Sequence, residues 1–204
     1  MWSDLTRGNL KSAVESLPMA TKALLTIADY TALEEPAGVR YELNEGELIV
    51  TPSASFFHNR LCDRFISLLD AHVTSHKLGD VTSETDVKLA EDVVRRPDVA
   101  FYRVGRLEGV DLDQVPLPVA PDLVIEIVSK NDRAADLLLK VSQSLAAGVE
   151  VVWLLYPSTQ LAYRYTASRL EPEVRSAQEG GKFEEPKILP GFSLTLAEIF
   201  SDPL

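Results

Sequence analysis

Cysteine, histidine and long apolar runs are all scarce in this chain of 204 residues. The one cysteine, Cys62, excludes an intramolecular disulfide and a zinc site built from cysteines, and it is typical of a reducing compartment. With only three histidines (His58, His72 and His76), a histidine-rich metal site is not expected. No run of about 18 apolar residues occurs, so the sequence predicts no membrane span. The N-terminus also lacks the apolar core of a secretory signal, and we therefore expect a cytoplasmic protein.

Positive charge is also in deficit, since the net charge is −11. This balance argues against a protein that binds long DNA through a general basic surface, because DNA affinity rests largely on Lys and Arg. A cluster of acidic metal ligands would lower the charge of the metal-free chain, and a local basic strip can outweigh the total. The acidity therefore disfavours nucleic-acid binding without excluding it.

The order of apolar patterns predicts an α/β protein with a mixed central β-sheet flanked by helices. Residues 26–204 are expected to form one domain, and residues 1–25 a helical N-terminal extension. The predicted elements are helices at 10–17, 26–33, 54–75, 131–147 and 196–200, a hairpin at 39–50, and strands within 81–89 and at 98–102, 122–129, 151–155 and 161–166. The unbroken apolar run around residues 123–128 is typical of a central strand.

Two carboxylates lie in segments that are predicted to be buried strands. Asp98 follows Pro97 at the start of one strand, and Glu126 stands among apolar residues in the middle of another. A buried carboxylate is costly unless a cation compensates it, and two of them side by side favour a bound divalent metal. The backbone carbonyl of Ile127 offers a third oxygen ligand for Mg²⁺, with Mn²⁺ as a substitute. Lys140, on the following predicted helix, would orient an attacking water and screen phosphate charge.

The segments RPDVAFY (96–102), PDLVIEIVS (121–129) and GVEVVWLLYP (148–157), together with the later Asp and Lys of the next helix, resemble the PD-(D/E)XK nuclease superfamily. More closely, YELNEGELIVTPSASFFH (41–58) and LPGFSLTLAEIF (189–200) resemble the Uma family of proteins described as restriction endonucleases. The resemblance covers roughly residues 26–200. It implies a restriction-endonuclease-like core and a Mg²⁺-dependent endonuclease that hydrolyses phosphodiester bonds.

The resemblance implies a catalytic set of Asp98, Glu126 and Lys140, with Asp98, Glu126 and Ile127 as metal ligands. The superfamily lysine normally comes two residues after the second acid, where Val128 stands, so the family implies its displacement to Lys140. Asp136 is four residues before Lys140 and is expected to pair with it. Ser144 stands where the family pattern has an aromatic residue.

Each of these residues also has a simpler interpretation. Asp98 could be a turn residue, Glu126 could form a buried ion pair with Arg96, and Lys140 could be a solvated helix lysine. Glu47 and His58 match recurring family positions and are expected, like Asp136, to line the cleft, with an exposed strand acid and a helix-face histidine as the alternatives. Arg95 and Arg96 could contact phosphate or pair with acids. Asp122, although preceded by Pro121, is expected to start its strand.

The function hypothesis is therefore a restriction-type endonuclease acting on nucleic acid, with DNA favoured, and forming a homodimer through its N-terminal helices. One rival is a binding or regulatory module that kept the fold and lost catalysis. Another is hydrolysis of RNA or small nucleotides in the same cleft. Fold alone does not distinguish these functions.

Overall fold

The largest element of the computed structural model, which describes residues 24–201, is a six-stranded sheet in the order β10-β9-β8-β7-β6-β3. The helix expected at 10–17 lies outside the described residues. Strands β7 and β8 run parallel, and the other neighbouring strands of this sheet are antiparallel. The predicted mixed sheet is therefore confirmed. Its strands are β3 (Gly79–Thr82), β6 (Val99–Arg103), β7 (Leu123–Ile127), β8 (Val151–Tyr156), β9 (Leu161–Thr166) and β10 (Arg169–Ser176).

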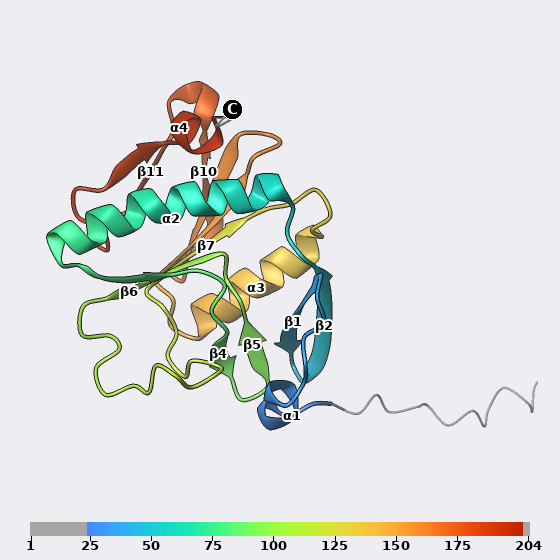
Figure 1. The fold of residues 1–204 in the computed structure, drawn as a ribbon. Helices are drawn as coiled ribbons and strands as arrows, with labels where there is room; N and C mark the ends of the chain where they lie inside the picture. The colour runs from blue at the N-terminus through green and yellow to red at the C-terminus, as the bar shows by residue number, and fades with distance from the viewer. Residues whose placement is uncertain (1–23, 202–204) are drawn as a thin grey trace, which may run out of the picture.

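A smaller antiparallel sheet, in the order β2-β1-β5-β4, lies beside the first (Figure 1). Its strands are β1 (Val39–Asn44), β2 (Glu47–Pro52), β4 (Val87–Ala90) and β5 (Val93–Arg95). The β1–β2 hairpin turns through Glu45 and Gly46, which both have positive φ, as a two-residue turn of this kind requires. A two-stranded ribbon, β11 (Lys182–Glu184) with β12 (Ser193–Thr195), completes the strands.

The helices are α1 (Ile27–Thr31), α2 (Phe56–His76), α3 (Ala134–Ala146) and α4 (Leu196–Phe200), with a short 3-10 turn, η1 (Ala177–Glu179). Ser55 caps α2 by accepting a hydrogen bond from the His58 N–H. Asn131 and Asp132 are residue types favoured at an N-cap, but α3 begins after Arg133. The Asp132 carboxylate instead accepts from the Ser129 N–H at 2.8 Å and closes a turn before the helix.

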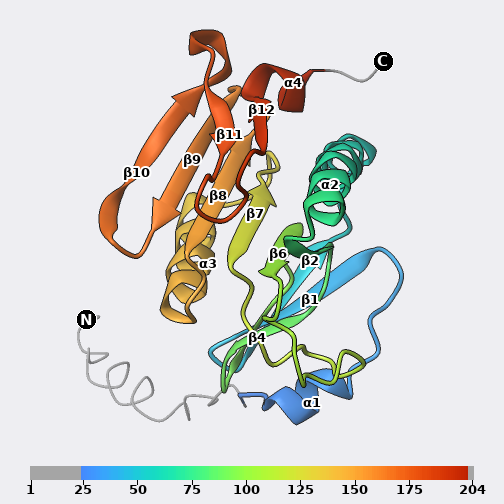
Figure 2. The ribbon, with the colours of Figure 1, turned by 90° about the vertical axis from the view of Figure 1, so that its left-hand side faces the viewer.

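Strand β7 is buried on both faces because α2 and α3 cover opposite sides of the large sheet (Figure 2). Its odd-numbered residues, such as Ile125, join the apolar cluster around α2. Val124 packs with Leu137 and Val141 of α3. Because side chains alternate between the faces of a strand, this pattern directs the side chain of Glu126 to the α3 face.

Several predicted boundaries held, and some elements were missed. The Pro-rich segment 109–121 is a loop, and β5, β10 and the β11–β12 ribbon were not predicted. These strands are short or interrupted by polar residues, so their pairing comes from tertiary contacts rather than from periodicity. None of the helices within residues 24–201 has the length and apolar character needed to cross a membrane.

Candidate active site

A cavity of about 970 Å³ opens where the two sheets, the start of α2 and one side of α3 meet. Asp98, Glu126 and Lys140, which are far apart in the sequence, all line it. The cavity is also lined by Arg40, Glu42, Asn44, His58, Arg95, Arg96, Ile127, Lys130, Arg133 and Asp136. The structure therefore brings the main sequence-predicted site residues together.

Asp98 and Glu126 are neighbours because of strand pairing. The antiparallel β6–β7 ladder ends where Val99 is paired with Ile125, so Asp98, just before β6, and Glu126, just after Ile125, lie at the same end of the ladder. Two acids are thus held side by side at the cavity.

The Asp98 carboxylate is fixed by two hydrogen bonds. One oxygen, Oδ2, accepts from the backbone N–H of Ile127 at 2.7 Å, and the other, Oδ1, lies 3.0 Å from Nε2 of His58. Burial lowers the pKa of His58, but the hydrogen bond and charge of Asp98 outweigh it and leave that pKa above its ordinary value. Each carboxylate oxygen keeps a second lone pair, so the pair of contacts orients Asp98 without using up its capacity for a cation.

Glu126 is buried without a compensating donor. Among residues 24–201, none lies within hydrogen-bond or ion-pair distance of its carboxylate. Burial raises the pKa of Glu126 to about 8; the charge of Lys140 opposes this shift, and that of Asp98 adds to it. The ion pair with Arg96 that the sequence left open does not form. Ionising a buried carboxylate in this state is unfavourable unless a cation compensates its charge.

Lys140 is held by a carboxylate, but not by Asp136. Its Nζ donates to Oε1 of Glu42 at 2.8 Å, whereas Asp136 is exposed at the cavity wall. Burial lowers the pKa of Lys140, yet the neighbouring charges of Glu126 and Glu42 raise it above its ordinary value overall. Lys140 is therefore an ammonium group in the metal-free protein. The expected pairing with Asp136 is wrong, because the ammonium of Lys140 pairs instead with Glu42 of β1.

Glu42 is the site residue that the sequence interpretation missed. It is 5% exposed, and its carboxylate accepts from Lys140, from Nη1 of Arg95 at 3.1 Å and from the Arg96 backbone N–H at 3.1 Å. A signal was present in the hairpin, where Arg40, Glu42 and Asn44 alternate with apolar residues. All three line the cavity, so the alternation marks the face of β1 that points into the site.

Arg95 extends this polar cluster to α3. Its guanidinium donates to Asn44 Oδ1 at 2.8 Å and to Gln143 Oε1 at 2.6 and 2.9 Å, besides its contact with Glu42. Arg95 is 6% exposed, and its hydrogen bonds connect the small sheet to α3. Of the two interpretations of Arg95 and Arg96, pairing with acids is the one the structure supports.

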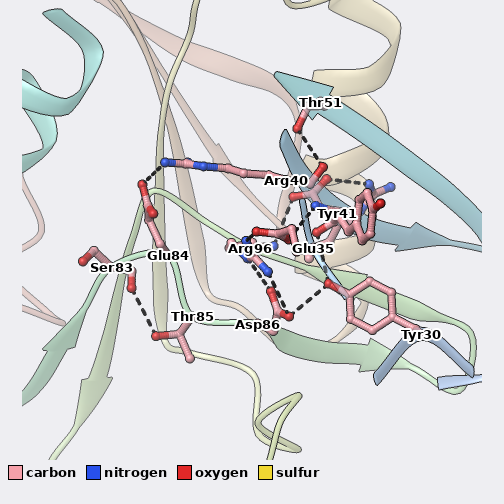
Figure 3. Close-up of polar contacts among 12 residues, drawn as sticks. Tyr30, Glu35, Arg40, Tyr41, Thr51, Ser83, Glu84, Thr85, Asp86 and Arg96 are labelled. Carbon is pink, nitrogen blue, oxygen red and sulfur yellow. Dashed lines mark hydrogen bonds and ion pairs between the residues drawn. The ribbon is translucent and has the colours of Figure 1, made fainter. Parts of the chain in front are cut away.

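Arg96 anchors the segment that leads into Asp98 (Figure 3). Its Nε donates to Asp86 Oδ1 at 2.6 Å, and its Nη1 donates to Glu35 Oε1 at 3.0 Å. The hydroxyl of Tyr30 donates to the other Asp86 oxygen at 2.9 Å. The network ties α1 to the strand connection before β6 and so fixes the position of Asp98.

The remaining predicted residues lie in different places. His58 lines the cavity and contacts Asp98, whereas Glu47, in β2 opposite Asn44, is outside the cavity lining. Asp122 starts β7 as expected, and its carboxylate accepts from the Arg103 backbone N–H at 2.9 Å. Ser144 is buried on α3.

Comparison with known proteins gives the class first. A crystal structure from Anabaena variabilis, described as "a putative nuclease belonging to DUF820", has the same fold, with a TM-score of 0.76 at 20% identity. The match covers 86% of this chain and 97% of that one. At this identity, the likeness shows the fold, an α/β architecture shared with that protein.

A family model then places the chain more closely. The model Uma2, described as "Putative restriction endonuclease", matches residues 27–197. The chain belongs to the Uma2 family, and the family predicted from the sequence is confirmed. No curated protein matches the chain.

Proposed function

We propose that this protein is a metal-dependent nuclease that hydrolyses phosphodiester bonds. The observation that carries the proposal is Glu126, a buried carboxylate with no donor among the described residues and with Asp98 at its side. Membership of the Uma2 family and the likeness to the Anabaena variabilis protein support a nuclease. A cation between the two acids would remove the electrostatic cost of holding both ionised.

The donor set suits a hard divalent cation. Asp98 and Glu126 would hold Mg²⁺ through carboxylate oxygens, and the carbonyl of Ile127, at the cavity end of β7, would be a third ligand. Mn²⁺ takes similar oxygen ligands and would substitute. When bound, such an ion polarises the phosphate and lowers the pKa of a water.

Lys140 would act as an electrostatic helper. Because the Glu42 carboxylate accepts from its Nζ and favours its charged form, it is poorly suited to remove a proton at the start of the reaction. Its ammonium would instead neutralise phosphate charge and orient the attacking water. Glu42 would hold this ammonium in place, as a positioning residue.

Nucleic acid is the substrate class that the cavity favours, and DNA is the first candidate. Lys130 and Arg133 are exposed at the cavity, and neither makes an ion pair with another described residue. They supply free positive charge at one edge of an otherwise acidic molecule, as phosphate contacts require. Cutting both strands of a duplex would take two such cavities, and a homodimer would provide them.

The test combines metal binding with cleavage. Calorimetric titration of Mg²⁺ or Mn²⁺ is expected to show binding to the wild type and none to Asp98→Ala. Plasmid and single-stranded DNA should be cut in Mn²⁺, and Glu126→Gln should abolish the cutting. Glu45→Gln, an exposed change in the hairpin turn, is the matched control and should cut normally. Equal metal affinity in wild type and Asp98→Ala would refute the proposal.

The same assays separate the rival functions. A binding or regulatory module would bind DNA in a mobility-shift assay without cutting any substrate in Mn²⁺. Cleavage of RNA or of small nucleotides alone would change the proposed substrate from DNA to that class. It would still agree with the proposed metal-dependent hydrolysis.

A further inference from the structure

Cys62 lies next to the site without a role in the proposed chemistry. It is four residues after His58 on α2, so both side chains lie on the same face of the helix. One ligand atom from each of His58, Cys62 and Asp98 lies within 4.8 Å of the other two. The simpler interpretation is that Cys62 is a core residue, since it packs in the apolar cluster of α2.

From this geometry, we infer that His58, Cys62 and Asp98 form a second metal site, selective for a borderline ion such as Zn²⁺ or Co²⁺ and separate in chemistry from the Mg²⁺ site. An imidazole, a thiolate and a carboxylate are the ligands that these ions favour, whereas Mg²⁺ binds oxygen ligands. On binding the ion, the Cys62 thiol loses its proton to solvent and the sulfur becomes a ligand.

The dimensions are close to those of such a site. Metal–ligand bonds of about 2.0–2.3 Å in a tetrahedron set the ligand atoms roughly 3.5 Å apart. The His58 and Asp98 atoms, at 3.0 Å, would open slightly, and Cys62 would approach by about 1.3 Å at most. A rotamer adjustment supplies a movement of that size without a change in the backbone.

Two further observations favour the site. Nδ1 of His58 is buried without a hydrogen-bond partner in the described part of the chain, so an ion bound through Nε2 would replace only the contact of this ring with Asp98. His58 and Asp98 also line the cavity, which gives the ion an entry path and leaves its fourth position open to water. The three protein ligands are each 9% exposed or less.

The two sites share Asp98 and are therefore mutually exclusive. A Zn²⁺ ion held by His58, Cys62 and Asp98 would withdraw Asp98 from the neighbouring Mg²⁺ and stop cleavage. This competition rests on the proposed function, whereas the existence of the second site does not.

The first test is Co²⁺ titration of the full chain in thiol-free buffer. Binding through sulfur produces a near-ultraviolet thiolate-to-cobalt charge-transfer band, and the chain has only one cysteine to supply it. The wild type should show the band at one Co²⁺ per chain, and Cys62→Ser should lose it. Cys62→Ala serves the same purpose if the serine variant does not fold. A folded wild type without the band would overturn the inference.

Two controls isolate the ligands. His72 and His76 stack on the same helix and offer a surface metal site, so His76→Ala should leave the band unchanged. Asp98→Asn should weaken Co²⁺ affinity by about tenfold or more. An unchanged affinity in Asp98→Asn would refute the shared ligand.

Glu126→Gln separates this inference from the proposed function. It removes a ligand of the Mg²⁺ site only, so it should retain the cobalt band while losing Mg²⁺ binding. Zn²⁺ inhibition, measured against the Mg²⁺-only rate of each protein, should need about tenfold more Zn²⁺ or more in Cys62→Ser. Equal inhibition of both proteins would show that Zn²⁺ acts elsewhere.

Discussion

Lys140 and Glu42 are 98 residues apart in the chain, yet the ammonium of one donates to the carboxylate of the other at 2.8 Å. This contact joins α3 to the small sheet across the cavity. Glu42 also binds Arg95 and the Arg96 backbone, so one buried acid organises three donors around the site. The position of the ammonium therefore depends on a strand that precedes Asp98 and Glu126, the proposed metal ligands, in sequence.

Replacing Glu42 should consequently disturb both stability and activity. Glu42→Gln leaves Arg95 and Lys140 without their shared negative charge, and removing one partner of a buried ion pair costs about 3–5 kcal/mol. Because Lys140 is partly exposed, we expect a loss near the lower end of that range in the free energy of unfolding, measured with urea.

Cleavage by Glu42→Gln should also fall, by roughly 10- to 100-fold, because the ammonium loses its orientation. Glu45→Gln, in the same hairpin but exposed at the turn, is the control and should match the wild type in both measurements. A Glu42→Gln protein as stable and as active as the wild type would show that Glu42 positions nothing.

The chain contains two Pro-Asp steps, and they provide a matched pair of mutations. Asp98→Asn should lose Mg²⁺ affinity with little change in fold, because His58 and the Ile127 N–H still have an amide to contact. Asp122→Asn should keep Mg²⁺ affinity but lower stability by about 1–3 kcal/mol, since its carboxylate binds the Arg103 backbone and guanidinium.

Calorimetry and thermal unfolding of both variants measure these two effects. The opposite pattern, with metal affinity lost in Asp122→Asn and kept in Asp98→Asn, would contradict the proposed site. It would place the metal at the Asp122 end of β7.

Much of this arrangement was predictable from the sequence, and the predictions that were wrong or missing have physical causes. The unbroken apolar run around Glu126 predicted both a central strand and a buried acid, because a strand that is buried on both faces is apolar at nearly every position. The partner of Lys140 was not predictable in the same way. Local spacing favoured Asp136 at i−4, whereas the actual partner, Glu42, comes from a strand whose position depends on the packing of two sheets.

Strand β5 shows the same limit. Its three residues carry too little periodicity to be recognised, yet they place Arg95 beside Glu42. The metal-ligand role proposed for Cys62 was also not predictable, since a cysteine in an apolar helix pattern is ordinarily a core residue. Only the fold brings Asp98 to the helix face where Cys62 and His58 lie.

The raised pKa of Glu126 predicts a pH dependence of stability in the metal-free protein. Its folded pKa is about 8, above the ordinary value of 4.5, so the native state retains a proton that the unfolded state releases. Stability is therefore highest below pH 4.5 as far as this group is concerned, and it falls as pH rises towards 8. In Glu126→Gln, this contribution is absent.

Thermal and urea unfolding in EDTA should reveal the difference. The stability of Glu126→Gln relative to wild type should rise with pH by up to about 1.4 kcal/mol per pH unit within that window. Saturating Mg²⁺ should reverse the order at pH 8, because only the wild type gains a ligand. Parallel pH profiles for the two proteins in EDTA would show that Glu126 titrates normally.

Lys130 and Arg133 should govern the salt dependence of DNA binding. Both are exposed at the cavity, and neither pairs with an acid among residues 24–201. Removing a phosphate contact lowers the slope of log affinity against log salt by about one. Lys130→Ala and Arg133→Ala should each do so and weaken binding similarly for different DNA sequences, whereas Lys88→Ala, whose partner is the exposed Glu91, should not.

Fluorescence anisotropy in Ca²⁺, which suppresses cutting in many Mg²⁺ sites because the larger ion tolerates poorer geometry, measures the slopes. If both slopes equal that of the wild type, the phosphates cross a different face of the protein.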